Sequence, residues 1–235
     1  MGMPFKMHTE TKLEKWRRDT FWQKEPETIA WIDAFDGGIF FDVGANVGVY
    51  SLYCAARHPE MGVIALEPDP ENYYALTRNI RLNGFNNIFA IPFALYTHLH
   101  FARISLSGDA GATGAAIGCG NYPVVSIGLL NLLDVERYID VTYMKIDIDG
   151  HELPIIQYGE TFLAATQCRS ILLECGLNDK AEILRIMAGC GWTPDERFNS
   201  MTPHSSQRRR MEKINVENIV FRQTEPQRRT ETHGR

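Results

Sequence analysis

Two acids that frame a glycine turn are the first residues in this sequence whose types and spacing suggest chemistry. Asp42 follows the apolar run Ile39–Phe41, and residues 43–48 form a turn with glycine at positions 44 and 48. Glu67 ends a second apolar run, nineteen residues after Gly48. Strand, glycine turn, helix, strand and acid is the order of a nucleotide-binding βαβ unit, whose second acid accepts hydrogen bonds from ribose hydroxyls. Glycine lets the backbone approach such a ligand closely.

The turn departs from the dinucleotide fingerprint G-x-G-x-x-G. Asn46 stands at the second glycine position and Val49 at the third, and no lysine or arginine lies between Asp42 and Ala56 to meet phosphate charge. An acid at position 42 repels a pyrophosphate and attracts a sulfonium or ammonium. S-adenosylmethionine has ribose, adenine and a cationic tail without phosphate, so the turn favours this ligand. The alternative is an ordinary tight turn in an α/β core.

A second polar cluster follows a strand predicted in the middle of the chain. Lys145, Asp147 and Asp149 alternate in sequence and therefore share one side of an extended strand. Methyl transfer from a sulfonium is an in-line displacement, and an alcohol acceptor must lose its proton as the new bond forms. Asp147, by position, and His151, by its ordinary pKa, are the preferred bases, with Asp149 and Glu174 as further candidates.

These candidates have alternative roles. His151 could be an exposed histidine at a helix start, and Lys145 could pair with a neighbouring acid rather than act in chemistry. The clustered carboxylates could instead hold a magnesium ion that lowers the pKa of the acceptor. No dedicated metal-binding spacing demands the ion, so no metal ligands are predicted.

The remaining pattern predicts an alternating α/β chain. Predicted strands lie at residues 39–41, 62–66, 88–93, 141–147 and 170–173, with a final antiparallel pair at 192–198 and 218–222. Predicted helices cover residues 49–56, 153–163 and 180–188, and a further one carries Tyr73, Leu76 and Ile80 towards the core. Leu99–Leu106 could form an extra hairpin, and the glycine-rich residues 107–120 are either a lid or a connector.

Three segments in this order carry a family resemblance: FDVGANVGVYSL, ALEPDPENYYALTRNIRLNG and MKIDIDGHELPII. They closely resemble the FkbM family of S-adenosylmethionine-dependent methyltransferases. The resemblance implies a class I, Rossmann-like α/β fold with a seven-stranded, mostly parallel sheet and helices on both faces. It also implies O-methylation of a hydroxyl on a small molecule, sugar or lipid-linked acceptor. The residues that it assigns to the cofactor are Asp42, Val43, Gly44, Ala45, Asn46, Gly48, Glu67, Pro68, Asp69, Phe93 and Ala94.

The sequence departs from the family pattern in two places. Asp149 stands where the family more often has glutamate, and Val124–Leu130 lacks the aspartate that the family often carries. Two further segments offer additional contacts with a ligand. Glu27 and Thr28 could reach the amino-acid end of the ligand, and the basic run Ser205–Arg210 could contact an anionic substrate.

Composition is that of a globular protein of 235 residues, with 44% hydrophobic and 23% charged residues. A net charge of −5 argues against a nucleic-acid partner, and no apolar run approaches the roughly 18 residues that span a bilayer. With no secretory signal and an odd number of cysteines, a cytoplasmic location is expected. We expect a helical region at 1–37, the methyltransferase domain at 38–222 and a polar tail at 223–235.

Two other functions compete with methyl transfer at this stage. A nicotinamide-dependent oxidoreductase is disfavoured by Asn46 and Asp42. A cofactor-binding protein without catalysis is the second alternative. The acceptor and the oligomeric state stay open.

Overall fold

The computed structural model describes residues 2–106, 108, 111, 117–118, 120–136, 141–201 and 216–224. The basic run Ser205–Arg210, nearly all of the predicted C-terminal tail and much of the glycine-rich segment lie outside these residues.

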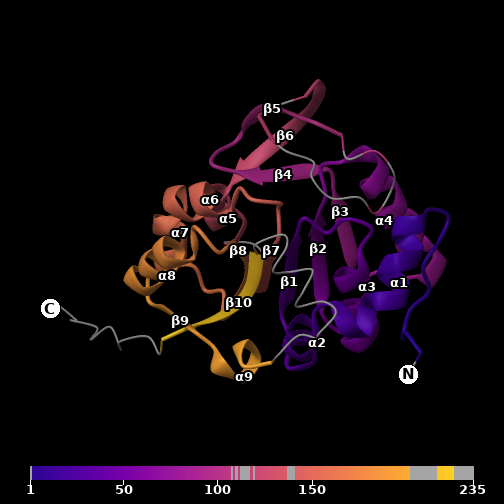
Figure 1. Ribbon diagram of the computed structural model, residues 1–235, viewed down its shortest axis with the longest axis horizontal. Helices are drawn as coiled ribbons and strands as arrows, with labels where there is room; N and C mark the ends of the chain where they lie inside the picture. The colour runs from indigo at the N-terminus through magenta and orange to yellow at the C-terminus, as the bar shows by residue number, and fades with distance from the viewer. Residues whose placement is uncertain are drawn as a thin grey trace, which may run out of the picture.

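The centre of the molecule is a seven-stranded sheet with the order β3-β2-β1-β7-β8-β10-β9 (Figure 1). The five strands from β3 to β8 run parallel, and β10 and β9 complete the sheet in antiparallel fashion. This confirms the predicted mostly parallel, Rossmann-like sheet. Its strands are β1 (Ile39–Val43), β2 (Gly62–Leu66), β3 (Ile88–Ile91), β7 (Val141–Ile146), β8 (Ser170–Gly176), β9 (Trp192–Pro194) and β10 (Val216–Gln223).

Helices cover both faces of this sheet, because successive side chains of a strand point to opposite sides. Phe40 packs with helices on one face and Phe41 with helices on the other. All six residues of β7 are buried, as expected for a parallel strand covered twice. The first face carries α1 (Lys12–Lys24), α2 (Pro26–Asp33), α3 (Val49–Arg57), α4 (Pro70–Asn83) and the short α9 (Glu196–Asn199). The second carries α5 (Leu129–Glu136), α6 (Glu152–Tyr158), α7 (Glu160–Ala165) and α8 (Lys180–Gly189).

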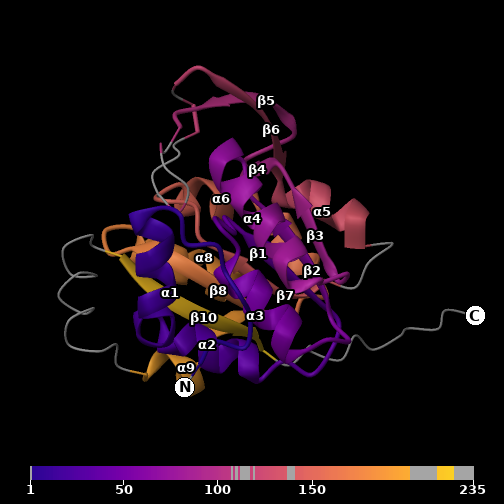
Figure 2. The same cartoon turned by 90° about the vertical axis from the view of Figure 1, so that its right-hand side faces the viewer.

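A separate three-stranded sheet stands above the carboxyl ends of the main strands (Figures 1 and 2). Its strands, in the order β4-β6-β5, are β4 (Phe93–Tyr96), β5 (His100–Ile104) and β6 (Tyr122–Gly128). The predicted single strand 88–93 is therefore wrong, because Pro92 has no N–H for the ladder and the chain changes sheet there. The predicted hairpin at Leu99–Leu106 is also wrong: β5 is a single strand that pairs antiparallel with β6.

Two smaller predictions also change. The predicted strand 192–198 ends at Pro194, because the Asp195 side chain accepts a hydrogen bond from the Arg197 N–H and begins α9. On α4 the buried side chains are Asn72, Ala75, Leu76 and Asn79. Leu76 and Ile80 pack in the core as predicted, whereas Tyr73 is only half-buried and donates its hydroxyl to the Ala90 carbonyl.

Candidate active site

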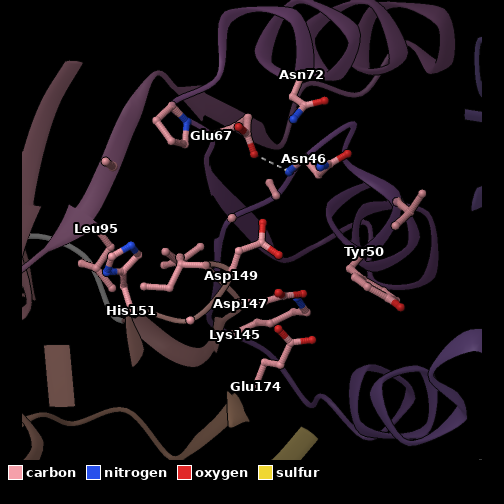
Figure 3. A pocket seen from close by; sticks show the side chains of 18 of the residues that line it. Asn46, Tyr50, Glu67, Asn72, Leu95, Lys145, Asp147, Asp149, His151 and Glu174 are labelled. Carbon is pink, nitrogen blue, oxygen red and sulfur yellow. Dashed lines mark hydrogen bonds and ion pairs between the residues drawn. The ribbon is translucent and has the colours of Figure 1, made fainter. Parts of the chain in front are cut away.

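A cavity of about 430 Å³ opens where the strand order reverses, between the carboxyl ends of β1 and β7. Open α/β sheets bind ligands at this position. Most of the residues predicted to bind the cofactor or to act in catalysis line it (Figure 3). They come from the end of β1 and the turn after it, from the loops after β2 and β7, and from the start of β4. They are Val43, Gly44, Ala45, Asn46, Glu67, Pro68, Phe93, Ala94, Asp147, Asp149 and His151.

The glycine turn is fixed by close contact with the loop after β7. A Cβ atom on Gly44 would lie 1.8 Å from the Asp147 carbonyl oxygen, and Gly44 has a φ of +75° that other residues rarely adopt. The N–H groups of Gly44 and Ala45 both donate to the Leu66 carbonyl, at 3.0 and 2.9 Å. Glycine at position 44 thus allows the turn after β1 to contact the loop after β7 directly.

Glu67 supports the same turn from the end of β2. Its Oε2 accepts a hydrogen bond from the Asn46 N–H at 2.7 Å, and its Oε1 accepts one from the Asp69 N–H at 2.9 Å. The residue is 4% exposed, and burial raises the pKa of this carboxyl to about 7. Each oxygen retains a further lone pair for a ligand hydroxyl.

Three predicted cofactor residues do not line the cavity. Asp42 is buried beneath it, where Oδ2 accepts a hydrogen bond from the Ser51 hydroxyl at 2.6 Å and Oδ1 has no hydrogen-bond partner. Asp69 caps α4 by accepting hydrogen bonds from the first turn of that helix. Gly48 begins α3, where a Cβ atom would lie 2.4 Å from Leu76 Cδ1. These residues build the turn rather than face the space above it.

An ion pair between a buried lysine and a half-buried aspartate lies at the floor of the cavity. Lys145 Nζ lies 2.6 Å from Asp147 Oδ2, with Lys145 only 1% exposed and 5.2 Å from the Tyr50 ring centroid. The expected pairing of Lys145 with a neighbouring acid is confirmed. Burial alone would raise the pKa of Asp147, but the charges of Lys145 and Lys24 outweigh it and lower that pKa to about 2.

Glu174, at the end of β8, lies beside this pair and behaves in the opposite way (Figure 3). Burial raises the pKa of its carboxyl to about 9, and the negative charges of Asp147 and Glu25 add to the effect. Glu25 is itself buried and forms an ion pair with Lys24. Two carboxyls with pKa values driven so far apart in one cavity are the pattern of an acid–base site.

Asp149 and His151 occupy the rim on the side of the small sheet. Asp149 is exposed, has a φ of +58° and reaches into the cavity between Glu67 and Asp147 (Figure 3). The His151 ring makes an edge contact with Tyr96 at a centroid separation of 6.0 Å. Neither residue is as deeply placed as Asp147 and Glu174.

Helix α1 supplies lining residues that the sequence did not reveal: Trp16, Arg17 and Lys24. Its capping box of Thr11 and Glu14 marks the start of a helix but gives no sign of which face meets a ligand. Tyr50 and Asn72 are further lining residues that were not predicted. By contrast, Glu27 and Thr28 do not line the cavity, since Glu27 accepts a hydrogen bond from Asn218 and Thr28 donates one to Glu25.

Comparison with known proteins identifies the family. A family model described as the methyltransferase FkbM domain matches residues 42–193, which contain the turn, Glu67 and the acidic cluster. The chain belongs to the FkbM methyltransferases. It is thus a methyltransferase enzyme, and the oxidoreductase and non-catalytic alternatives are set aside.

Named relatives of this FkbM protein cover it to different extents. The hexuronic acid methyltransferase AglP of Haloferax volcanii is 24% identical over 178 residues, which are 71% of this chain and 69% of that protein. The 31-O-demethyl-FK506 methyltransferase FkbM of Streptomyces tacrolimicus is 44% identical, but over 43 residues that make up 18% and 16% of the two chains. The solved structure of a putative rRNA methylase from Clostridium thermocellum matches with a TM-score of 0.50 at 9% identity, over 84% of this chain and 94% of that one. That likeness shows the shared fold alone.

Within the described part of the chain, no three histidine, cysteine, aspartate or glutamate side chains are grouped as a metal site requires. The charge of Asp147 is already met by Lys145, whose ammonium would repel a divalent cation. The magnesium hypothesis therefore gains no support. Among the described helices, none has the length and hydropathy needed to cross a bilayer.

Proposed function

We propose that this protein is an S-adenosylmethionine-dependent O-methyltransferase that acts on a hydroxyl of a small molecule, sugar or lipid-linked acceptor. The observation that carries the proposal is that one cavity holds two acids suited to different tasks. One is placed to accept hydrogen bonds from ribose hydroxyls, and the other is placed to take a proton from the acceptor. Glu67 stands at the end of β2, and Glu174 stands beside the Lys145–Asp147 pair at the ends of β7 and β8.

The lining residues suggest how the donor lies. The backbone of the turn at 44–46 borders the methionine tail, and Glu67 accepts the ribose hydroxyls with its remaining lone pairs. Pro68, Phe93 and Ala94 give an apolar border for adenine on the side of the small sheet. This placement directs the sulfonium towards the acids at the end of β7.

Charge also favours a cationic donor. Lys24 and Lys145 each already face an acid, Glu25 and Asp147. Asp42 and Glu174 add acid to the same region. A sulfonium entering this cavity supplies a positive charge to a site that holds more acids than bases. The buried Asp42 contributes through this field, without direct contact.

Glu174 is our choice for the base, in place of Asp147. A carboxylate with a pKa of about 2 is too weak a base to take a hydroxyl proton, and Lys145 already occupies Asp147. Glu174 is a stronger base, with a pKa of about 9 in the free protein, and a bound sulfonium favours its ionised form. As the acceptor oxygen bonds to the methyl carbon, the carbon–sulfur bond breaks, S-adenosylhomocysteine leaves and the hydroxyl proton passes to Glu174. Asp149 and His151, at the rim, are placed to orient the acceptor.

The named relatives guide the choice of acceptor. One acts on a hexuronic acid and another on a demethylated FK506, so a carbohydrate or another hydroxylated small molecule is favoured over a nucleic acid. The net charge of −5 is consistent with this choice.

The test is transfer of a labelled methyl group from S-adenosylmethionine to a panel of sugars, uronic acids and hydroxylated macrocycles, read by mass spectrometry. Glu174→Gln should lower kcat about 10²- to 10⁴-fold while donor affinity changes only slightly. Glu182→Gln, on the surface of α8 in an exposed pair with Arg185, is the matched control and should leave both unchanged. Failure of the wild-type protein to bind the donor would overturn the proposed function, and normal kcat in Glu174→Gln would overturn the choice of base.

A further inference from the structure

Arg17 is a buried cation on the wall of the cavity, and the reaction as proposed gives it no role. It lies on α1, is 8% exposed and lines the cavity. Its Nε donates a hydrogen bond to the Gly111 carbonyl at 2.9 Å. Among the described residues, this is the one hydrogen bond that the guanidinium makes, and no carboxylate forms an ion pair with it. A guanidinium buried without an anionic partner is costly, which indicates that a partner arrives from outside.

The contacts of Gly111 hold this side chain in place. The Gly111 N–H donates to Asn72 Oδ1 of α4 at 2.7 Å. On its other side Gly111 lies against α1, where a Cβ atom would be 3.2 Å from both the Glu14 nitrogen and the Leu13 Cβ. The guanidinium is therefore anchored through Nε alone, and its other edge stays available for a planar, two-oxygen ligand.

The other cations of the cavity are already neutralised. Lys24 faces Glu25 and Lys145 faces Asp147. Of the arginine and lysine residues that line the cavity in the described part of the chain, Arg17 is thus the one that forms no ion pair with an acid. Burial raises the pKa of Glu67, and the positive charge of Arg17 partly offsets that rise; the same charge adds to those of Lys145 and Lys24, which lower the pKa of Asp147.

We propose that Arg17 is the carboxylate-binding residue of this cavity, and that it holds a ligand carboxylate by two parallel hydrogen bonds. The inference rests on the proposed function. Two ligands of the cavity could supply the carboxylate: the methyl donor, through its α-carboxylate, or the acceptor. A carboxylate fits better than a phosphate, because the flanking acids Glu67, Asp147 and Asp149 repel a second negative charge and the flat guanidinium matches two coplanar oxygens.

The experiment compares Arg17→Met with the wild-type protein towards ligands that have or lack the carboxylate. Arg18→Met is the matched control, since Arg18 is the adjacent, exposed residue of the same helix and pairs with Asp19. One arm measures calorimetric Kd values for S-adenosylmethionine and its decarboxylated analogue. The other arm measures KM for a hexuronic acid and for the corresponding neutral hexose. Arg17→Lys, which retains the charge without the fork, tests the two-bond geometry.

If Arg17 holds the donor, Arg17→Met weakens S-adenosylmethionine binding about 10- to 100-fold and leaves the decarboxylated analogue unchanged. If it holds the acceptor, donor affinity is unchanged and KM rises by a similar factor for the uronic acid alone. Equal effects on both members of each pair, with or without a lower melting temperature, would show that Arg17 only anchors Gly111. That result overturns this inference alone, whereas a wild-type protein that does not bind the donor overturns the proposed function together with it.

Discussion

Replacing Glu67 with glutamine should weaken donor binding and loosen the glycine turn, because one carboxylate serves both. Its two oxygens accept hydrogen bonds from the Asn46 and Asp69 N–H groups at 2.7 and 2.9 Å. Glutamine keeps one acceptor oxygen and turns an NH₂ group towards the other N–H. One backbone donor is then buried without a partner.

The size of the effect follows from that lost partner. A buried N–H without an acceptor costs about 1–3 kcal/mol. For a domain of this size each kcal/mol corresponds to roughly 2–4 °C, so the melting temperature should fall by about 2–12 °C. Loss of a charge-assisted bond to the ribose, at about 1–2 kcal/mol, should raise the donor Kd about 5- to 30-fold.

The pH dependence gives a sharper test. Burial raises the pKa of Glu67 from its ordinary 4.5 to about 7. Its stabilising contribution is thus fully present below about 4.5 and is lost as the pH rises through 7. In the free protein the difference in melting temperature between wild type and Glu67→Gln should therefore narrow above pH 7. Donor binding should behave oppositely, because ribose hydroxyls and a sulfonium both favour the ionised carboxylate.

The assay is calorimetric titration with S-adenosylmethionine at pH 6 and pH 8, together with thermal unfolding of the free protein. Glu182→Gln, on the surface of α8, should change neither quantity. A donor Kd that is unaltered at pH 8, accompanied by a lower melting temperature, would refute the ribose role and leave Glu67 as a brace for the turn.

Three further outcomes are expected. Gly44→Ala should unfold at a clearly lower denaturant concentration than Gly84→Ala. Both positions have positive φ, but a Cβ at Gly44 lies 1.8 Å from the Asp147 carbonyl oxygen, whereas the space at Gly84 is open. The Gly84→Ala substitution should therefore lower the free energy of unfolding by only about 1–2 kcal/mol. Equal denaturation midpoints would contradict the close contact of the two loops. Lys145→Met should cost about 3–5 kcal/mol of unfolding free energy in urea, since it removes the ion-pair partner of Asp147 from among several acids. An unchanged midpoint would count against this pairing. The rate kcat/KM should rise with pH as Glu174 ionises, and Glu174→Gln should flatten this rise; an equally steep profile in the variant would point to another base.

Local sequence was sufficient to predict the site where its residues are close together in the chain. Gly44, Asn46 and Glu67 lie within one βαβ unit, so strand length, glycine spacing and a terminal acid predicted their meeting. The parallel sheet followed from apolar runs separated by helices, because such strands are buried on both faces. The break at Pro92 moved β4 into a second sheet, and a missing N–H in the sequence was the signal that could have predicted it.

The sequence by itself determined which residues could bind a sulfonium nucleoside and which acids could take a proton. Only the tertiary structure decided among those acids. Asp147 is nearest in sequence to Lys145 and loses its basicity to that ammonium, whereas Glu174 comes from another strand and forms no ion pair with a cation of the described residues. Arg17 is more remote still, brought to the cavity by α1 and fixed by Gly111. The role of Arg17 depends on whether an acid lies beside it in the folded protein. No local sequence pattern predicts this, because burial and neighbouring charges are set by the tertiary structure.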